Sequence, residues 1–213
     1  MIDFNHKTLI RESEWMRVYK LQNGNTYVYE SKFLMDGLHI SPATIKKKWP
    51  ALSPPERLEF ASAFSSQPPR NKDDHEILEY LMEVGSEDVW RAIAKLLPFH
   101  PSRDRAVKFL LERVRDTHQG RANYYQAIES LGGDSTLSPL RQRHDEYLRL
   151  LSKESGSDQF DLWIDYLQCC KTLWALTLDP MFVSELIEKQ GSAPLEVRPV
   201  VARLLQEIEK MQS

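Results

Sequence analysis

The six histidines of this chain are its most versatile chemical groups, but their spacing builds no metal site. No two of them lie four residues apart, the separation at which two helical histidines share a zinc ion. His75 and Glu79 share one face of an expected helix, where a surface hydrogen bond or ion pair explains them. His144 lies in an apolar stripe between Leu140 and Tyr147, so we expect a core or groove histidine satisfied by one backbone carbonyl. The sequence therefore predicts no bound metal ion.

Nucleophilic and phosphate-binding motifs are also absent from the sequence. The chain has no Gly-x-Ser-x-Gly, no Walker loop, no Gly-x-Gly-x-x-Gly and no Cys-x-x-Cys. The adjacent Cys169 and Cys170 point about 100° apart on a helix, so we expect two small buried thiols rather than a redox pair. Asp161 and Asp165 could lie on a groove, but no carboxylates cluster among apolar neighbours as acid catalysis requires. The sequence predicts no catalytic residue and no cofactor.

The composition is that of an ordinary globular domain. The 213 residues are 41% hydrophobic and 28% charged, and the formal net charge is −3. No apolar run is long enough to cross a bilayer, and residues 1–6 lack the basic and apolar regions of a signal peptide, so we expect a cytoplasmic protein. Basic side chains outnumber acidic ones only in the middle of the chain, over residues 100–150, which we interpret as a solvated helix surface. We expect neither nucleic acid nor a membrane as the partner.

Residues 15–30 differ from the rest of the chain because they are rich in aromatic and β-branched side chains. They read as two strands on either side of Asn23-Gly24, a pair that suits the positive φ angles of a tight turn. We expect a β-hairpin here and no other sheet. Two strands alone are marginally stable in water, so the hairpin must pack on helices, with Trp15, Val18 and Tyr27 as the expected contacts.

Four helix starts of one kind recur along the chain, each with a capping oxygen directly before a proline. They are Ser41-Pro42, Ser53-Pro54, Ser138-Pro139 and Asp179-Pro180. Apolar side chains at helical spacing follow these starts and fill the intervening segments. The expected helices are residues 41–48, 53–64, 73–84, 87–97, 103–116, 121–131 and 158–177, with further helices from Ser138, from Pro180 and after Gly191.

The apolar stripes of these helices predict which side chains form the core. The helix over 53–64 has a stripe of Leu58, Ala61 and Phe64, and the stripe of the next helix ends at Val84. The helix over 158–177 is apolar on nearly all sides, so it is predicted to lie at the centre of the packing.

Two helical segments are alike enough to indicate an internal repeat. Val89–Leu97 can be laid without a gap over Val197–Leu205, 108 residues later. That offset holds three repeats of about 36 residues. The breaker-rich residues 65–72 separate this part of the chain from the N-terminal part. We therefore expect an N-terminal hairpin with capping helices over residues 1–64 and helical repeats over 73–212, joined in one continuous domain.

Three segments resemble the second helix of HEAT-like repeats, which in that family often begins Val-Arg and ends Ala-Leu-Gly before a turn. They are Val89–Leu97, Arg121–Leu137 and Val197–Leu205. The second matches best, with a Leu-Gly helix end and an Asp in the turn. The resemblance covers roughly residues 73–212, and helix 158–177 departs most because it is long, aromatic and without the Val-Arg start. It implies a mainly α fold, an α-α superhelix (a HEAT-like solenoid) with the short β-hairpin at its N-terminal end.

In HEAT-like arrays the second helices line the concave side, so the resemblance implies partner binding there. The exposed faces of helices 87–97, 121–131 and 158–177 would form this surface, with Arg91, Lys95, Arg121 and Tyr125 as the candidate partner contacts. No catalytic constellation accompanies this architecture, and the net charge is unsuited to polyanions. We therefore expect a non-catalytic protein-binding or scaffold module whose partner is another protein.

The alternative is a HEAT-like DNA-binding protein that resembles the alkylpurine DNA glycosylases. These enzymes bind duplex DNA in a concave basic groove lined by Trp, Tyr, Arg and one Asp. The groove candidates here are Trp90, Tyr125, Trp163, Asp165 and Arg121. A net charge of −3 leaves little excess positive charge for phosphate neutralisation. No position matches a catalytic motif of that family.

Overall fold

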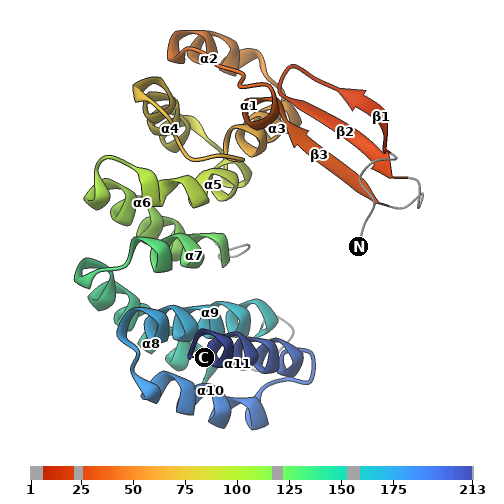
Figure 1. Ribbon diagram of the computed structural model, residues 1–213. Helices are drawn as coiled ribbons and strands as arrows, with labels where there is room; N and C mark the ends of the chain where they lie inside the picture. Colours follow the sequence, from red (N-terminus) through yellow and green to blue (C-terminus); the bar gives the residue numbers. More distant parts are fainter. Residues whose placement is uncertain (1–6, 22–25, 117–121, 153–158, 213) are drawn as a thin grey trace. The chain divides into compact units, whose positions relative to one another are not determined.

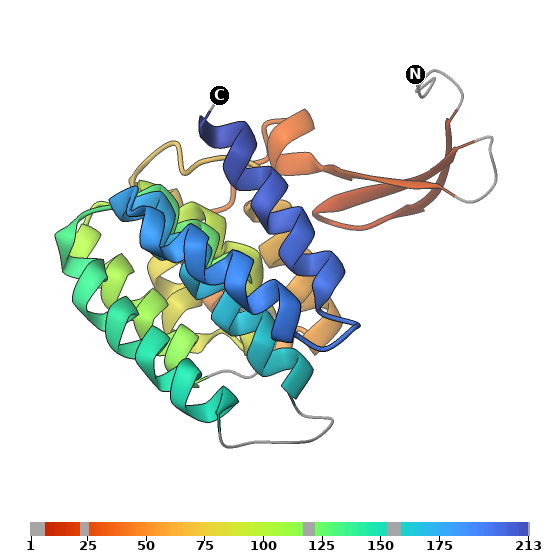
Figure 2. The same cartoon turned by 90° about the horizontal axis from the view of Figure 1, so that it is seen from below.

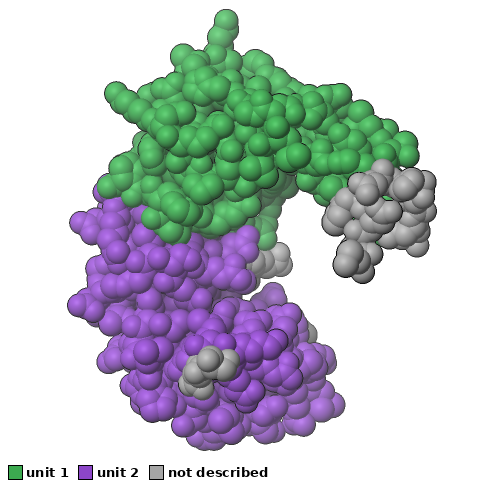
Figure 3. Space-filling model, viewed as in Figure 1, with its two compact units in different colours: residues 1–101 green, residues 102–213 purple. Residues whose placement is uncertain are grey.

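The computed structural model describes residues 7–21, 26–116, 122–152 and 159–212 of the chain (Figure 1). Within these residues the fold is mainly α-helical, with eleven α-helices, three short 3₁₀ helices and one small sheet. The chain divides into two compact units, Met1–Pro101 (unit 1) and Ser102–Ser213 (unit 2) (Figure 3). The expected mainly α fold with an N-terminal sheet is confirmed.

Unit 1 begins with a three-stranded antiparallel sheet made of β1 (Lys7–Glu12), β2 (Met16–Leu21) and β3 (Tyr27–Ser31), in that order. β2 and β3 form the expected hairpin, with Val18 opposite Tyr29, whereas the Asn23-Gly24 turn lies outside the described residues. The sequence did not predict β1, which extends the hairpin to a third strand of the same sheet by pairing with β2, with a register shift between Leu9 and Arg11. All six residues of β1 are exposed, so its sequence lacks the alternating pattern that predicts a half-buried strand.

The described part of unit 1 continues with five α-helices and two 3₁₀ turns. They are α1 (Lys32–Met35), α2 (Pro42–Lys48), η1 (Trp49–Ala51), α3 (Pro54–Phe64), α4 (Lys72–Val84), α5 (Glu87–Ile93) and η2 (Ala94–Phe99). The Ser41 side chain caps α2 by accepting a backbone N–H at 3.3 Å, and Ser53 donates its N–H and its hydroxyl to Glu56 at the start of α3. The single helix expected over 87–97 is α5 followed by η2, because Pro98 lacks the N–H that a continuous α-helix requires.

An aromatic cluster forms the core of unit 1 and joins the sheet to the helices. Phe60 of α3 lies at its centre. The Phe60 ring centroid lies 5.2 Å from that of Trp15, 5.7 Å from Phe33 and 6.1 Å from Trp49. Phe64 stacks on Phe60 at 5.9 Å, and all five side chains are buried. The hairpin therefore packs on the helices through Trp15, as expected.

Three apolar side chains that the sequence assigned to contacts inside the fold are exposed. Leu58 is 37% exposed, Val84 41% and Tyr27 48%. α3 turns Phe60 toward the sheet, and Leu58, two positions earlier, lies on a different face of the same helix. Val84 is the last residue of α4, and Tyr27 is the first residue of β3. At such element ends, the stripe no longer has a packed neighbour to cover it.

The described residues of unit 2 form six α-helices and one 3₁₀ turn. They are α6 (Arg103–Asp116), α7 (Ala122–Leu131), η3 (Asp134–Thr136), α8 (Leu137–Leu151), α9 (Gln159–Thr177), α10 (Pro180–Ser192) and α11 (Arg198–Gln212). Consecutive helices contact each other in the pairs α6–α7, α8–α9 and α10–α11, and α9 also contacts α10. Because α9 also contacts α7 and α11, and α6 contacts α8, the pairs stack beside one another, as Figure 2 shows for the C-terminal helices.

α9 is the central helix of unit 2, as its sequence predicts. It contacts α7, α8, α10 and α11, and every residue from Asp165 to Trp174 is buried. Both cysteines lie in this stretch as free buried thiols, which the sequence also predicts. The buried Lys171 has its ammonium 3.7 Å from Glu129 of α7 and 3.4 Å from Glu207 of α11, so its charge is paired on two sides.

Candidate functional site

The side chains predicted to contact a partner have different surroundings. Arg91 of α5 is ion-paired along its own helix with Asp88 and lies 4.0 Å from Glu87. Lys95 in η2 is exposed. Arg121 lies outside the described residues. Lys95 is thus the candidate with the most accessible charge among those that the structure describes.

Tyr125 is a core residue, which corrects its assignment to an exposed face. Its side chain is 0% exposed, and its hydroxyl lies 3.2 Å from that of Tyr147. Burial, followed by the neighbouring Cys169, raises the pKa of Tyr125. Trp163 and Asp165, which the glycosylase resemblance suggested, are also buried in α9. The apolar stripes of α7 and α9 turn all three residues toward other helices, so none of them lies on an exposed face.

An open groove of about 640 Å³ lies on unit 1, between β3, α1 and α3. Its apolar lining comes from Tyr29, Leu34, Met35 and Leu58, which are 65%, 54%, 58% and 37% exposed. Large apolar side chains scattered singly over a surface are normal, but a contiguous group around one hollow is typical of an interaction site. We call this feature the N-terminal groove.

Local contacts hold the walls of the N-terminal groove in place. Ser31, the last residue of β3, donates its hydroxyl to the carbonyl of Ala63 in α3 at 2.7 Å. Arg17 of β2 donates two hydrogen bonds, of 2.8 and 2.6 Å, to the carboxylate of Asp36 directly after α1. These bonds hold the pKa of Asp36 below its ordinary value. Ser31 therefore ties β3 to α3, and Arg17 ties the C-terminal end of the four-residue α1 to the sheet.

Acidic side chains predominate on the rim of the N-terminal groove. The lining includes Glu30, Glu56 and Glu59 but a single basic side chain, Arg11. Arg11 pairs with Glu59, and Lys7 pairs with Glu30. Hydrogen bonds at the start of α3 hold the pKa of Glu56 below its ordinary value, so this carboxylate is charged at neutral pH. With Arg11 and Lys7 counted, the three carboxylates leave a net charge of −1, so the groove combines an apolar floor with a weakly negative rim.

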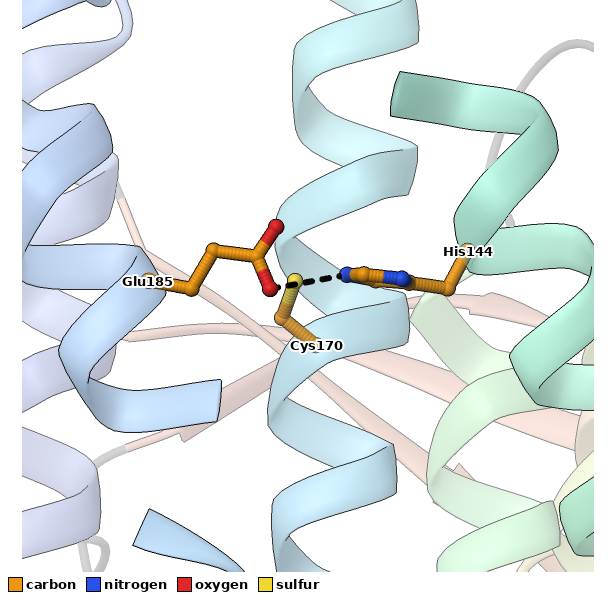
Figure 4. Close-up of side chains that lie close together, drawn as sticks. All are labelled: His144, Cys170 and Glu185. Carbon is orange, nitrogen blue, oxygen red and sulfur yellow. Dashed lines mark hydrogen bonds and ion pairs between the residues drawn. The ribbon is translucent and has the colours of Figure 1, made fainter. Parts of the chain in front are cut away.

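A buried polar cluster lies in unit 2 between three helices (Figure 4). His144 of α8, Tyr166 and Cys170 of α9 and Glu185 of α10 form it, and we call it the His144 cluster. Nε2 of His144 lies 3.1 Å from one carboxylate oxygen of Glu185, and Tyr166 donates its hydroxyl to the other oxygen at 2.7 Å. One ligand atom each from His144, Cys170 and Glu185 lie within 4.8 Å of one another. The three side chains point toward a common centre (Figure 4).

Burial and hydrogen bonding act in opposite directions on the His144 cluster. Burial lowers the pKa of His144, but the hydrogen bond and charge of Glu185 outweigh it, so this pKa lies above its ordinary value. Burial raises the pKa of Glu185, but hydrogen bonds from His144 and Tyr166 outweigh it, so this pKa lies below its ordinary value. Burial raises the pKa of the Cys170 thiol. The cluster therefore favours an imidazolium–carboxylate pair beside a neutral thiol.

The apolar stripe of α8 places His144 in the core correctly, but the expected bonding partner is wrong. The ring bonds a carboxylate rather than a single backbone carbonyl, because Glu185 of α10 faces it. Glu185 is the residue that the sequence did not reveal, since it lies 41 positions after His144 and no local pattern links the two. The available signal was its place on the buried face of α10, three residues after Phe182.

Among the described residues, the His144 cluster supplies one group of three His, Cys, Asp or Glu side chains close enough to share a metal ion. In the same part of the chain no helix is both long and apolar enough to span a membrane. Comparison of the chain with protein-family models, curated proteins and solved structures found no match. Function is therefore inferred from the N-terminal groove and the His144 cluster themselves.

Proposed function

We propose that this protein is a non-catalytic, cytoplasmic protein-binding module, and that the N-terminal groove receives its partner. The observation that carries the proposal is the group of four large apolar side chains around one open hollow on unit 1. Tyr29, Leu34, Met35 and Leu58 keep much of their surface in water. Covering this surface with a partner's side chains would release that water, which is the main favourable term in most protein association.

The helix pairs of unit 2 support a scaffold built from HEAT-like repeats. α6–α7, α8–α9 and α10–α11 each contact the neighbouring pair. In repeat proteins this stacking buries the apolar stripes and leaves extended outer faces for binding. Arg91 and Lys95 lie in unit 1, on α5 and η2, and we propose that the surface around them adds contacts to those of the groove.

The partner that fits the N-terminal groove is a protein segment with large apolar side chains next to Lys or Arg. Apolar side chains would pack on Leu34 and Met35, and the flexible thioether of Met35 can adapt to different shapes. A basic side chain would face Glu56, whereas Glu30 and Glu59 already pair with Lys7 and Arg11. The apolar contacts would supply most of the affinity, and the rim charges would favour encounter with basic segments.

A library of short displayed peptides, selected on the full-length protein, tests the groove. The selected peptides should combine apolar with basic residues. The double variant Leu34→Asp/Met35→Asp should weaken their binding by about 30-fold or more, since truncating a hot-spot contact costs about 2 kcal/mol or more. The control is Leu195→Asp in unit 2, which places a single such charge at a side chain that is 75% exposed. Peptides that bind all three proteins equally would contradict the groove assignment.

The DNA glycosylase alternative makes a different prediction. Each phosphate that a protein neutralises releases counterions, so duplex binding should fall steeply as salt rises. Titration with duplex DNA at two salt concentrations, followed by an alkylbase-release assay, separates the two functions. Salt-sensitive binding together with base release would refute the protein-binding module.

A further inference from the structure

We infer that the His144 cluster is the binding site of one divalent zinc ion, with His144, Cys170 and Glu185 as its three protein ligands. The ligands come from α8, α9 and α10 and meet in the interior of unit 2 (Figure 4). Facing helices of a bundle are a common place for metal sites. The site is independent of the N-terminal groove, and it departs from the sequence-based expectation of no metal.

The ligand types favour zinc over the harder cations. Imidazole and thiolate are preferred zinc ligands and carboxylate is an accepted one, whereas magnesium and calcium take oxygen ligands. Zinc bonds of about 2.0–2.3 Å in a tetrahedral site place nitrogen and oxygen ligands about 3.3 Å apart, and sulfur about 3.6 Å from either. Nε2 of His144 and the Glu185 oxygen are already 3.1 Å apart.

The Cys170 sulfur lies within 4.8 Å of the other two ligand atoms. It must therefore move closer to them by about 1.2 Å at most to reach tetrahedral zinc separations. A displacement of this size is within the reach of side-chain rotation. The apo arrangement of the three ligands is thus close to the arrangement that the ion requires.

Outer contacts orient two of the three ligands. Tyr166 donates a hydrogen bond of 2.7 Å to the carboxylate of Glu185, and Nδ1 of His144 lies 3.5 Å from the carboxylate of Asp145. The imidazole ring is packed between Tyr166 and Phe182, with both ring centroids 5.6 Å away. A carboxylate behind the histidine and a hydrogen bond to the ligating carboxylate are the outer partners that metal sites typically have.

Zinc also balances the charge of the site. The dication, the Cys170 thiolate, the Glu185 carboxylate and a neutral His144 sum to zero, which suits a site with little exposure to water. On binding, the S–H bond of Cys170 and the Nε2–H bond of the His144 imidazolium break, zinc–sulfur and zinc–nitrogen bonds form, and both protons leave to solvent. The hydrogen bond between His144 and Glu185 is replaced by two bonds to the same ion.

Three protein ligands leave the fourth position of a tetrahedral zinc ion to a water molecule. The Glu185 side chain is 17% exposed and that of His144 7%, so solvent approaches the cluster from the Glu185 side. A separate cavity of about 360 Å³, whose lining includes Leu148, Trp163 and Lys189 but none of the three ligands, lies along the same three helices. Leu148 and Lys189 each follow a ligand by one helical turn.

Cobalt(II) is the spectroscopic probe for this site. Full-length protein is stripped with a chelator and titrated with Co²⁺ alone. We expect one equivalent to bind with a thiolate-to-cobalt charge-transfer band and the strong visible bands of four-coordinate cobalt. Cys170→Ser should lose the charge-transfer band, whereas Cys169→Ser, the matched control one residue away, should keep it. Absence of the band in the unaltered protein, or its loss in Cys169→Ser alone, would overturn the assignment.

Competition with a chromophoric chelator then gives the zinc affinity of the folded variants, as checked by circular dichroism. Tyr166→Phe removes only the hydrogen bond to Glu185, so it should weaken zinc binding about 10–100-fold. Glu185→Gln removes a ligand and should weaken it more. These two variants decide the question if Cys170→Ser does not fold. Zinc affinities equal to that of the unaltered protein in both would refute the site.

Discussion

Replacing Phe60 by Ala tests the packing that supports the N-terminal groove. The Phe60 ring is 0% exposed and lies against the rings of Trp15, Phe33, Trp49 and Phe64. Truncation of a buried Phe to Ala costs about 3–5 kcal/mol, and aromatic pairs add about 0.5–1.5 kcal/mol each beyond their burial. Four rigid ring neighbours cannot collapse into the space, so we expect a loss of about 4 kcal/mol or more.

Leu58→Ala is the matched control, because Leu58 lies on the same helix and the sequence assigned it to the core. Its side chain is 37% exposed on the N-terminal groove, so truncation opens no closed cavity. Losing part of its burial should cost about 1 kcal/mol. The two variants therefore separate the observed core of α3 from the one that its apolar stripe predicts.

Guanidinium denaturation measures the loss of unfolding free energy in both variants. The transition is monitored by the fluorescence of Trp15, Trp49 and the other tryptophans. Hydrogen exchange in α3 and β2 shows whether the change is in unit 1. The free energies are comparable only if the denaturant slope is the same in both variants. A loss below about 2 kcal/mol for Phe60→Ala, or equal losses for both, would refute the packing described here.

Two further predictions concern the close packing around Gly85 and the ionisation of Glu56. Gly85→Ala should destabilise the protein by about 1–3 kcal/mol, because a Cβ there would lie 2.5 Å from the Leu81 carbonyl oxygen and 2.7 Å from Nε1 of Trp90; an unchanged melting temperature would contradict this. Hydrogen bonds from Ser53 lower the pKa of Glu56, so the ionised carboxylate stabilises the start of α3 at neutral pH. This contribution is lost as the pH falls through the lowered pKa. The difference in unfolding free energy between the unaltered protein and Glu56→Gln, measured in urea, should therefore shrink in acid, and a difference independent of pH would show that the carboxylate's charge is not involved.

Much of the fold could be predicted because its signals are local. The Ser41 cap and the Glu56 hydrogen bonds depend on residues within one helical turn, and both are present. The position of α9 at the centre of unit 2 follows from its own composition, since a helix that is apolar on all sides has to be covered on all sides. These features need no knowledge of which elements are neighbours in space.

The features that could not be predicted depend on which elements meet. β1 is stabilised by backbone hydrogen bonds to β2, and its exposed side chains show no pattern that indicates this pairing. Whether α3 buries Leu58 or Phe60 depends on where the sheet packs. The contact between His144 and Glu185 depends on how α8 and α10 are stacked. For the same reason, Tyr125 was assigned to an exposed face although α7 buries it.

The register shift in β1 has a consequence for the solubility of the protein. β1 is an outer strand of the sheet and exposes Leu9 and Ile10, which are 46% and 50% accessible. A flat outer strand with such side chains is a template for pairing with the same strand of another molecule. The irregularity between Leu9 and Arg11 interrupts the even ladder at that point, and the charged Lys7, Arg11 and Glu12 flank it. The irregularity and the charged side chains of β1 thus disfavour the edge-to-edge association that leads to aggregates.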